Sequence, residues 1–87
     1  MINSFLLKEF GDRIRNLRVQ KKLSQEQLSF KTGFHRTYIG MIERGERNIS
    51  LTNMAIFAKA FNLSIDELVK FKNAKVLFNK YKLKSDE

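Results

Sequence analysis

One stretch, residues 24–48, constrains the fold of this chain more than any other part of it. Ser24 and Gln27 have the spacing of a capping box, in which each side chain bonds the backbone amide of the other and a helix begins. Gly33 ends that helix early, because glycine tolerates the left-handed conformation that turns a chain sharply. A further short helix is expected from Arg36 to Arg44. Two short helices joined by a tight glycine turn predict a helix-turn-helix.

The remaining residues also show helical spacing. Residues 5–22 are predicted to form a helix, because apolar side chains recur there at steps of three, four and three: Leu7, Phe10, Ile14 and Leu17. Ser50 caps a fourth helix, with an apolar side made of Leu51, Met54, Ala58 and Phe61. A second capping box at 64–67 opens a fifth helix that offers Ile65, Leu68 and Val69 for burial. The chain has no proline, so we expect an all-α fold, a compact bundle of five short helices.

The C-terminal residues continue the apolar spacing: Phe71, Ala74, Phe78 and Tyr81 again step by three, four and three. This pattern predicts either a further helix or a long extension of the fifth helix. We therefore divide the chain into a helix-turn-helix domain, residues 1–72, and a C-terminal helical extension or tail of the same domain, residues 73–87. The tail stripe either completes the core of the monomer or packs against a second copy.

Charge restricts the partners of the chain. The net charge of +8 attracts a polyanion, either nucleic acid or an anionic membrane surface, although simply solvated lysines give the same total. The chain has no cysteine and one histidine, which excludes disulfides and leaves no set of residues for a metal site. There is no nucleophile–base pair and no phosphate loop, so we expect neither an enzyme nor a bound cofactor. No signal peptide or membrane span is recognised, and we expect a cytoplasmic protein.

The second helix of the motif should present a polar face to solvent. Ile39 and Ile42 tie it to the core, and the residues left facing outward are Arg36, Thr37, Gly40, Met41 and Arg44. An exposed helix of this kind fits the major groove of DNA, whose base edges carry a distinguishable pattern of donors and acceptors.

The same stretch resembles the Xre-like or Cro-like helix-turn-helix family, the fold of the lambdoid phage repressors. The resemblance covers residues 10–70. It is carried by LR at 17–18, LSQEQLS at 23–29, TGF at 32–34, RTYIGMIERGERN at 36–48, SL at 50–51 and LSIDEL at 63–68. RTYIG followed by IERGERN is similar, more narrowly, to the controller proteins of restriction–modification systems. The family usually has alanine in place of Ser29 and proline in place of Ile49, and neither departure changes the expected fold.

The resemblance implies roles for individual residues. The expected base contacts come from Arg36, Thr37 and Met41. The expected contacts to the DNA backbone come from Gln25, Tyr38, Gly40, Arg44, Arg47 and Asn48. The alternatives are that Arg36 meets phosphate only, that Tyr38 is a core tyrosine, that Gly40 only makes room for a neighbouring helix and that Met41 is simple packing. The family pairs the positions of Arg18 and Glu43 in a structural ion pair, and His35 is expected to cap or order the turn.

We therefore expect a sequence-specific regulator that binds double-stranded DNA as a homodimer, with no small-molecule ligand and no membrane partner. Regulators of this fold read paired half-sites about 34 Å apart, which favours a second copy on the tail stripe of Phe71, Ala74, Phe78 and Tyr81. The operon controlled is expected to encode a restriction–modification system. The alternative is an antitoxin or a phage-type repressor of the same fold whose main role is to bind a partner protein.

Overall fold

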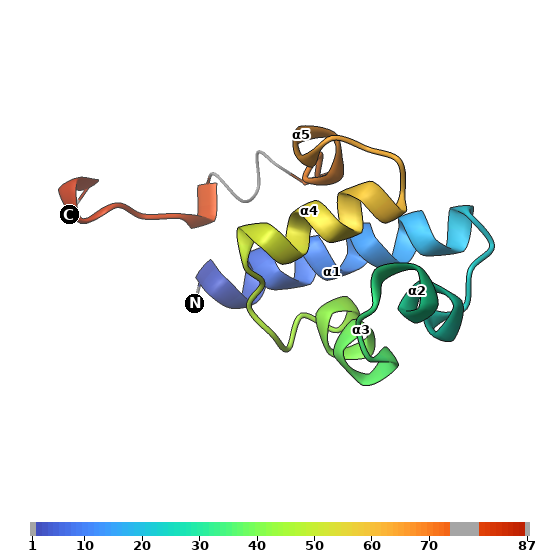
Figure 1. Ribbon diagram of the computed structural model, residues 1–87. Coiled ribbons are helices and arrows are strands. Elements are labelled where there is room, and N and C mark those ends of the chain that lie inside the picture. The colour runs from blue at the N-terminus through green and yellow to red at the C-terminus, as the bar shows by residue number, and fades with distance from the viewer. Residues whose placement is uncertain (1, 74–78, 87) are drawn as a thin grey trace.

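The computed structural model describes residues 2–73 and 79–86 (Figure 1). Its helices are α1 (Ile2–Gln20), α2 (Gln25–Thr32), α3 (Arg36–Glu43), α4 (Leu51–Ala60), α5 (Ile65–Leu68) and a final 3-10 turn, η1 (Lys84–Asp86). Across the described ranges there is no strand, and the expected all-α bundle of five short helices is confirmed. Within those ranges no helix combines the length and the apolar character that crossing a bilayer requires.

The helices enclose one apolar core. In Figure 1, α1 runs across the middle, α2 and α3 lie together below it, and α5 lies at the top beside α4. Close packing joins α1 to α3, α2 to both α3 and α4, and α4 to α5. The buried apolar side chains are Phe10, Ile14, Leu17, Leu28, Ile39, Ile42, Phe57, Ala58, Phe61 and Leu68. Every helix from α1 to α5 contributes to this set, so removing apolar surface from water drives all five together.

Serine caps begin three of the helices. Ser24, Ser50 and Ser64 each accept a hydrogen bond from the amide three residues later, and at 24–27 and 64–67 the return bond completes a capping box. Gly33 has φ of 80° and ends α2 as predicted. These caps satisfy amides that have no partner inside the helix, so the sequence sets the helix starts locally.

The first helix ends earlier than predicted. The first helix was expected to reach residue 22, but α1 ends at Gln20 because Lys22 turns the chain with a φ of 57°. Asn62 turns the chain after α4 in the same way, with a φ of 59°. Both residues adopt the left-handed conformation without being glycine, so no glycine marks these ends in the sequence.

The predicted apolar side of α4 is right at Met54, Ala58 and Phe61, which lie in or against the core, and wrong at Leu51. Phe57 is fully buried, whereas Leu51 in the first turn is 65% exposed. Phe57 packs against Phe34, with ring centroids 5.0 Å apart, and this contact ties α4 to the turn between α2 and α3. Ile65, also expected in the core, is 36% exposed, and Leu68 alone of the α5 helix residues is buried.

A side chain from α1 holds the end of α5. Arg13 donates from Nε to the carbonyl of Leu68 (2.9 Å) and from Nη2 to the carbonyl of Glu67 (2.7 Å). A cation at the C-terminal end of a helix is favoured by the helix dipole. Arg13 therefore fixes where α5 stops. The residue spacing of the first helix does not predict this role for Arg13.

The C-terminal residues were expected to be helical. The alternative in which the fifth helix continues into the tail is wrong, because α5 stops at Leu68 and residues 69–73 form turns and non-helical chain. Residues 79 and 80 are helical, while Ala74 and Phe78 of the predicted stripe lie outside the described residues. Tyr81 is 52% exposed. Phe71 is half-buried and packs edge-on against Phe10, with ring centroids 6.5 Å apart.

Candidate nucleic-acid interface

Helix α3 is anchored on one face and open on the other. Ile39 and Ile42 are at most 1% exposed, and they hold α3 against the core. Arg36 and Thr37, in the first turn, are both exposed. The predicted arrangement of α3, with isoleucines beneath and a polar first turn outward, is present in the structure.

His35 caps the N-terminus of α3. Its Nδ1 accepts a hydrogen bond from the amide of Thr37 at 3.1 Å. The expected capping role of His35 is thus observed. The cap fixes the direction in which the first turn of α3 leaves the glycine turn, and with it the placement of Arg36.

Replacing His35 with alanine should lower the free energy of unfolding by about 1 kcal/mol, because the amide of Thr37 loses its acceptor. His35→Asn is the matched control, since an asparagine oxygen at an N-cap accepts the same bond. Urea unfolding followed by circular dichroism measures both variants. Equal midpoints for His35→Ala and the unaltered protein would show that the cap contributes nothing.

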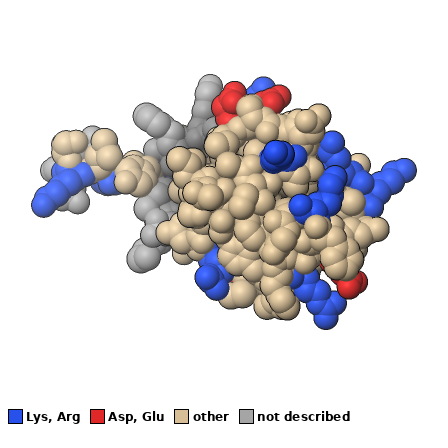
Figure 2. All heavy atoms as spheres, viewed as in Figure 1, with Lys and Arg blue, Asp and Glu red and all other residues tan. Residues whose placement is uncertain are grey.

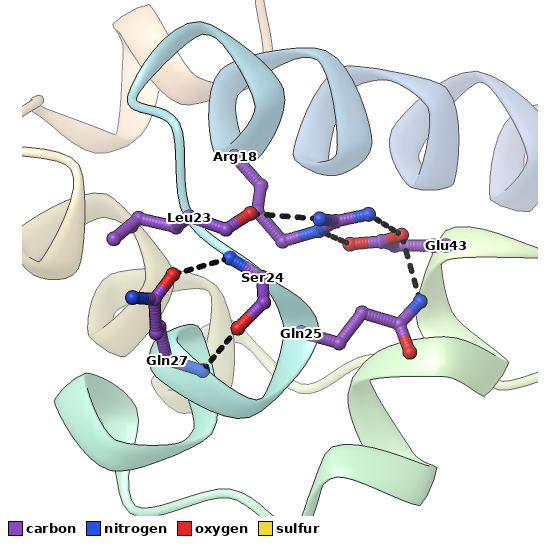
Figure 3. Close-up of polar contacts among 6 residues, drawn as sticks. All are labelled: Arg18, Leu23, Ser24, Gln25, Gln27 and Glu43. Atoms are coloured by element: carbon purple, nitrogen blue, oxygen red, sulfur yellow. Dashed lines mark hydrogen bonds and ion pairs between the residues drawn. The ribbon is translucent and has the colours of Figure 1, made fainter.

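A buried carboxylate connects α1, α2 and α3 (Figure 3). Glu43 accepts two hydrogen bonds from Arg18, from Nε at 2.6 Å and from Nη2 at 3.0 Å, in a two-pronged ion pair. Gln25 donates from Nε2 to the same carboxylate at 3.1 Å, and Arg18 also donates from Nη1 to the carbonyl of Leu23 at 2.8 Å. The pair expected from the resemblance is present, and Gln25 joins it. The angle between the two helices of the motif is therefore fixed by hydrogen bonds as well as by packing.

The ion pair is shielded from water. The Glu43 side chain is 4% exposed and that of Arg18 is 13% exposed. The hydrogen bonds to Glu43 raise the pKa of the Arg18 guanidinium; burial opposes the shift and the attraction to Glu43 adds to it. Among the described residues no buried side-chain polar atom lacks a hydrogen-bond partner. A buried charge with a full set of partners keeps one geometry, which suits a group that orients a helix.

Gly40 was expected to face outward, but it is buried. It lies beneath two side chains, and a Cβ there would lie 3.1 Å from Nη1 of Arg44 and 3.5 Å from Oε1 of Gln25. An added Cβ would therefore meet only the ends of the Gln25 and Arg44 side chains. Met41 is half-buried. The predicted contacts of Gly40 and Met41 with DNA remain predictions.

Tyr38 of α3 is the centre of a second cluster. The Tyr38 hydroxyl accepts a hydrogen bond from Nδ2 of Asn53 at 3.0 Å, and the guanidinium of Arg47 lies 5.7 Å from the centre of the Tyr38 ring. The ring also packs on Phe34, with centroids 5.0 Å apart. Tyr38 is half-buried, so its ring belongs to the domain, and its hydroxyl proton is still available to an acceptor.

Arg44 and Asn48 are exposed beside this cluster. Arg44 donates to Glu46 from Nε at 2.9 Å and from Nη2 at 3.1 Å. This pairing raises the pKa of Arg44, and the Arg44 hydrogen bond lowers the pKa of Glu46. Sequence reasoning gave Glu46 no part in the interface, although an acid two residues after a cation is visible in the sequence. Part of the positive charge of Arg44 is therefore compensated within the loop.

A surface hollow joins several of the candidate residues. It lies between the start of α2 and the outer face of α3 and is lined by Arg18, Ser24, Gln25, Glu26, Arg36, Thr37, Gly40 and Arg44. The exposed first turns of α2 and α3 thus border one concave surface, whereas Arg47 and Asn48 lie outside its lining. Such a surface can take the rounded ridge of a sugar-phosphate backbone between two helix starts.

Charge is unevenly distributed over the molecule. Figure 2 shows lysine and arginine side chains gathered at the right-hand edge of the domain and again on the C-terminal segment at the left. The acidic group at the top lies over α5, whose first turn carries Asp66 and Glu67. Hydrogen bonds from Ser64 lower the pKa of both carboxyl groups, which keeps that end of the molecule negative. A polyanion is repelled by α5 and attracted elsewhere.

The geometry of this interface agrees with that of the protein family to which the chain is similar. A helix-turn-helix family model matches residues 14–68, and the chain belongs to that family. Control protein C.SmaI of Serratia marcescens is 48% identical over 59 residues, which are 68% of this chain and 70% of that protein.

Two solved structures are similar over their length. The restriction–modification controller protein C.AhdI from Aeromonas hydrophila has 48% sequence identity and a TM-score of 0.69, and the match covers 71% of this chain and 94% of that one. The tetramer of the controller protein C.Esp1396I in complex with its natural 35 base-pair operator has 30% identity and a TM-score of 0.69, with 87% of this chain and 93% of that chain covered. The resemblance to controller proteins that RTYIG and IERGERN indicated is confirmed, since two such proteins are each 48% identical to this chain over the matched residues.

Proposed function

We propose that this protein is a transcriptional regulator that binds a specific double-stranded operator through the first turn of α3. The observation that carries the proposal is the pair Arg36 and Thr37, exposed on a helix whose opposite face is locked by Ile39, Ile42 and the Arg18–Glu43 ion pair. The guanidinium of arginine can bond O6 and N7 of one guanine, and the threonine methyl can meet a thymine methyl. Met41 would add an apolar contact.

The remaining candidates would hold the DNA in register. Gln25 begins α2 and could bond a phosphate beside the helix amides. Tyr38, Arg44, Arg47 and Asn48 lie at or beyond α3 and would contact the sugar-phosphate backbone, together with any contact from Gly40. Such contacts set orientation and affinity but carry no sequence information directly.

The similarity to controller proteins suggests the physiological target. We propose that the protein acts in the cytoplasm, without enzymatic activity, on the operon of a restriction–modification system. An endonuclease or methyltransferase gene beside its own gene, with the selected duplex upstream of them, is the expected finding. A toxin gene in that place would support the antitoxin alternative instead.

Selection from a pool of random duplexes tests operator binding. We expect the protein to enrich one sequence pattern and to bind the enriched duplex at least a thousand-fold more tightly than its scrambled version, in the range typical of specific regulators. Equal affinity for both duplexes at several salt concentrations would contradict the proposed sequence-specific binding.

Arg36→Ala should relax the selected pattern at one base position, with a loss of about 1–3 kcal/mol of discrimination there. Arg47→Ala is the control, because a phosphate contact should weaken binding to all duplexes alike. Fluorescence anisotropy with the selected duplex and its single-base variants measures both. If Arg36→Ala loses the same factor on every duplex, Arg36 meets phosphate only.

We also propose that the protein is a homodimer, with the tail stripe Phe71, Ala74, Phe78 and Tyr81 in its interface. Phe71 already packs on Phe10 inside the monomer, so it can serve both the core and a partner, whereas Tyr81 is half-exposed. We expect Tyr81→Ser to raise the dimer dissociation constant at least ten-fold in sedimentation equilibrium without changing the thermal midpoint of the monomer. An unaltered dimer would place the interface elsewhere.

A further inference from the structure

The C-terminal segment carries half of the net charge. Residues 70–87 contain six lysines and two acids, a net charge of +4 in a chain whose total is +8. The described lysines beyond the domain are Lys80, Lys82 and Lys84, and all three are exposed. Within the described ranges no carboxylate pairs with any of them.

The face of α3 is less positive than its arginines suggest. Of the three exposed arginines on and just after α3, Arg44 is compensated by Glu46, which leaves Arg36 and Arg47 as the strong cations of this region. The positive charge that would neutralise further phosphates is therefore concentrated in the tail and at the end of α1 (Figure 2).

The tail is placed and long enough to meet DNA. Figure 1 shows residues 79–86 projecting away from the domain, and Nζ of Lys80 lies 5.2 Å from the centre of the Phe5 ring, which puts this segment beside the start of α1. Lys84 follows Lys80 by four residues, and four extended residues span up to about 14 Å. The tail lysines therefore extend beyond the edge of the domain, beside the start of α1.

We propose that Lys80, Lys82 and Lys84 contact phosphates of the DNA that flanks the half-site read by α3. This inference rests on the proposed operator binding and adds a second contact surface to it. Lysine is a flexible point charge, so the tail raises affinity for every duplex and reads no base. Each phosphate neutralised steepens the fall of log affinity with log salt concentration by about 0.9.

The test compares two charge-matched double variants, Lys82→Gln/Lys84→Gln in the tail and Lys8→Gln/Lys59→Gln on the domain. Binding to the selected duplex and to its scrambled version is measured by anisotropy from 50 to 300 mM KCl. We expect the tail variant to lower the salt slope by about 1.8 and to weaken both duplexes by the same factor, at least ten-fold at 100 mM. The domain variant should change neither by more than a small fraction of that.

The outcomes separate this inference from the function it rests on. If the unaltered protein does not distinguish the selected from the scrambled duplex, the proposed function fails. If the unaltered protein does distinguish them, two results would refute the tail contact alone. One is an unchanged salt slope in the tail variant, and the other is a loss of affinity in the domain variant as large as in the tail variant. A tail variant that becomes monomeric in sedimentation, or that loses only its binding to phosphatidylserine-containing vesicles, also overturns the contact with DNA.

Discussion

Glu43→Ala should destabilise the protein by about 3–5 kcal/mol, the cost of leaving one partner of a buried ion pair without the other. The Arg18 guanidinium would keep a single partner, the carbonyl of Leu23, at a site where its side chain is only 13% exposed. Gln25 would lose its bond to the same carboxylate. Since a small domain has about 5–15 kcal/mol of stability in all, this loss should take a large share of the free energy of unfolding and lower the urea midpoint strongly.

Two controls make this prediction specific. Glu46→Ala removes the acid of the exposed pair with Arg44 and should leave the urea midpoint nearly unchanged, because solvent screens that pair. Glu43→Gln keeps most of the side-chain shape and one acceptor, so this variant should fold. Its urea midpoint should lie between those of Glu43→Ala and Glu46→Ala. If Glu43→Ala and Glu46→Ala unfold at the same urea concentration, Glu43 does not hold α3 in place.

Gly11→Ala should lower the free energy of unfolding nearly as much as Glu43→Ala. An added Cβ at Gly11 would lie 2.5 Å from the carbonyl oxygen of Glu43 and 2.8 Å from its carbon, and closer still to the carbonyl oxygen of Ile42. All of these atoms are backbone, so no side chain can rotate away, and α1 and α3 must separate. We expect a loss of about 3 kcal/mol, at the upper end for overpacking a well-packed interior, and a matching loss of operator binding.

At an exposed position of α1, substitution to alanine should not lower the stability. At an exposed position alanine is the best helix former, so Asn16→Ala should leave stability equal or slightly higher. Urea unfolding of both variants gives the comparison. A Gly11→Ala variant that gains stability, as helix propensity alone would predict, would contradict the close crossing of α1 and α3.

Local signals predicted most of the fold. The serine caps at 24, 50 and 64 and the turn at Gly33 are set by neighbours within a few residues, and the structure has each of them. The left-handed turn at Lys22 carries no local signal, whereas the one at Asn62 could have been predicted, because asparagine is enriched in that conformation. The face of α4 was misjudged at Leu51 because burial depends on which helix lies opposite.

The site was predicted unevenly for the same reason. Arg36 and Thr37 were placed outward correctly, since Ile39 and Ile42 fix the inward face of α3. Gly11 and Arg13 owe their roles to contacts with other helices, which no spacing within one helix displays. Gln25 was expected at a phosphate, and its hydrogen bond to Glu43 emerged only from the structure.

A nuclear magnetic resonance study of the complex with the selected duplex is the most direct test of the central claim, that α3 reads base edges with its first turn. We predict intermolecular nuclear Overhauser effects between the side chains of Arg36 and Thr37 and protons of the major-groove base edges, and none from Asp66 of α5. Contacts confined to the tail lysines or to α5, with the resonances of α3 unshifted, would contradict it.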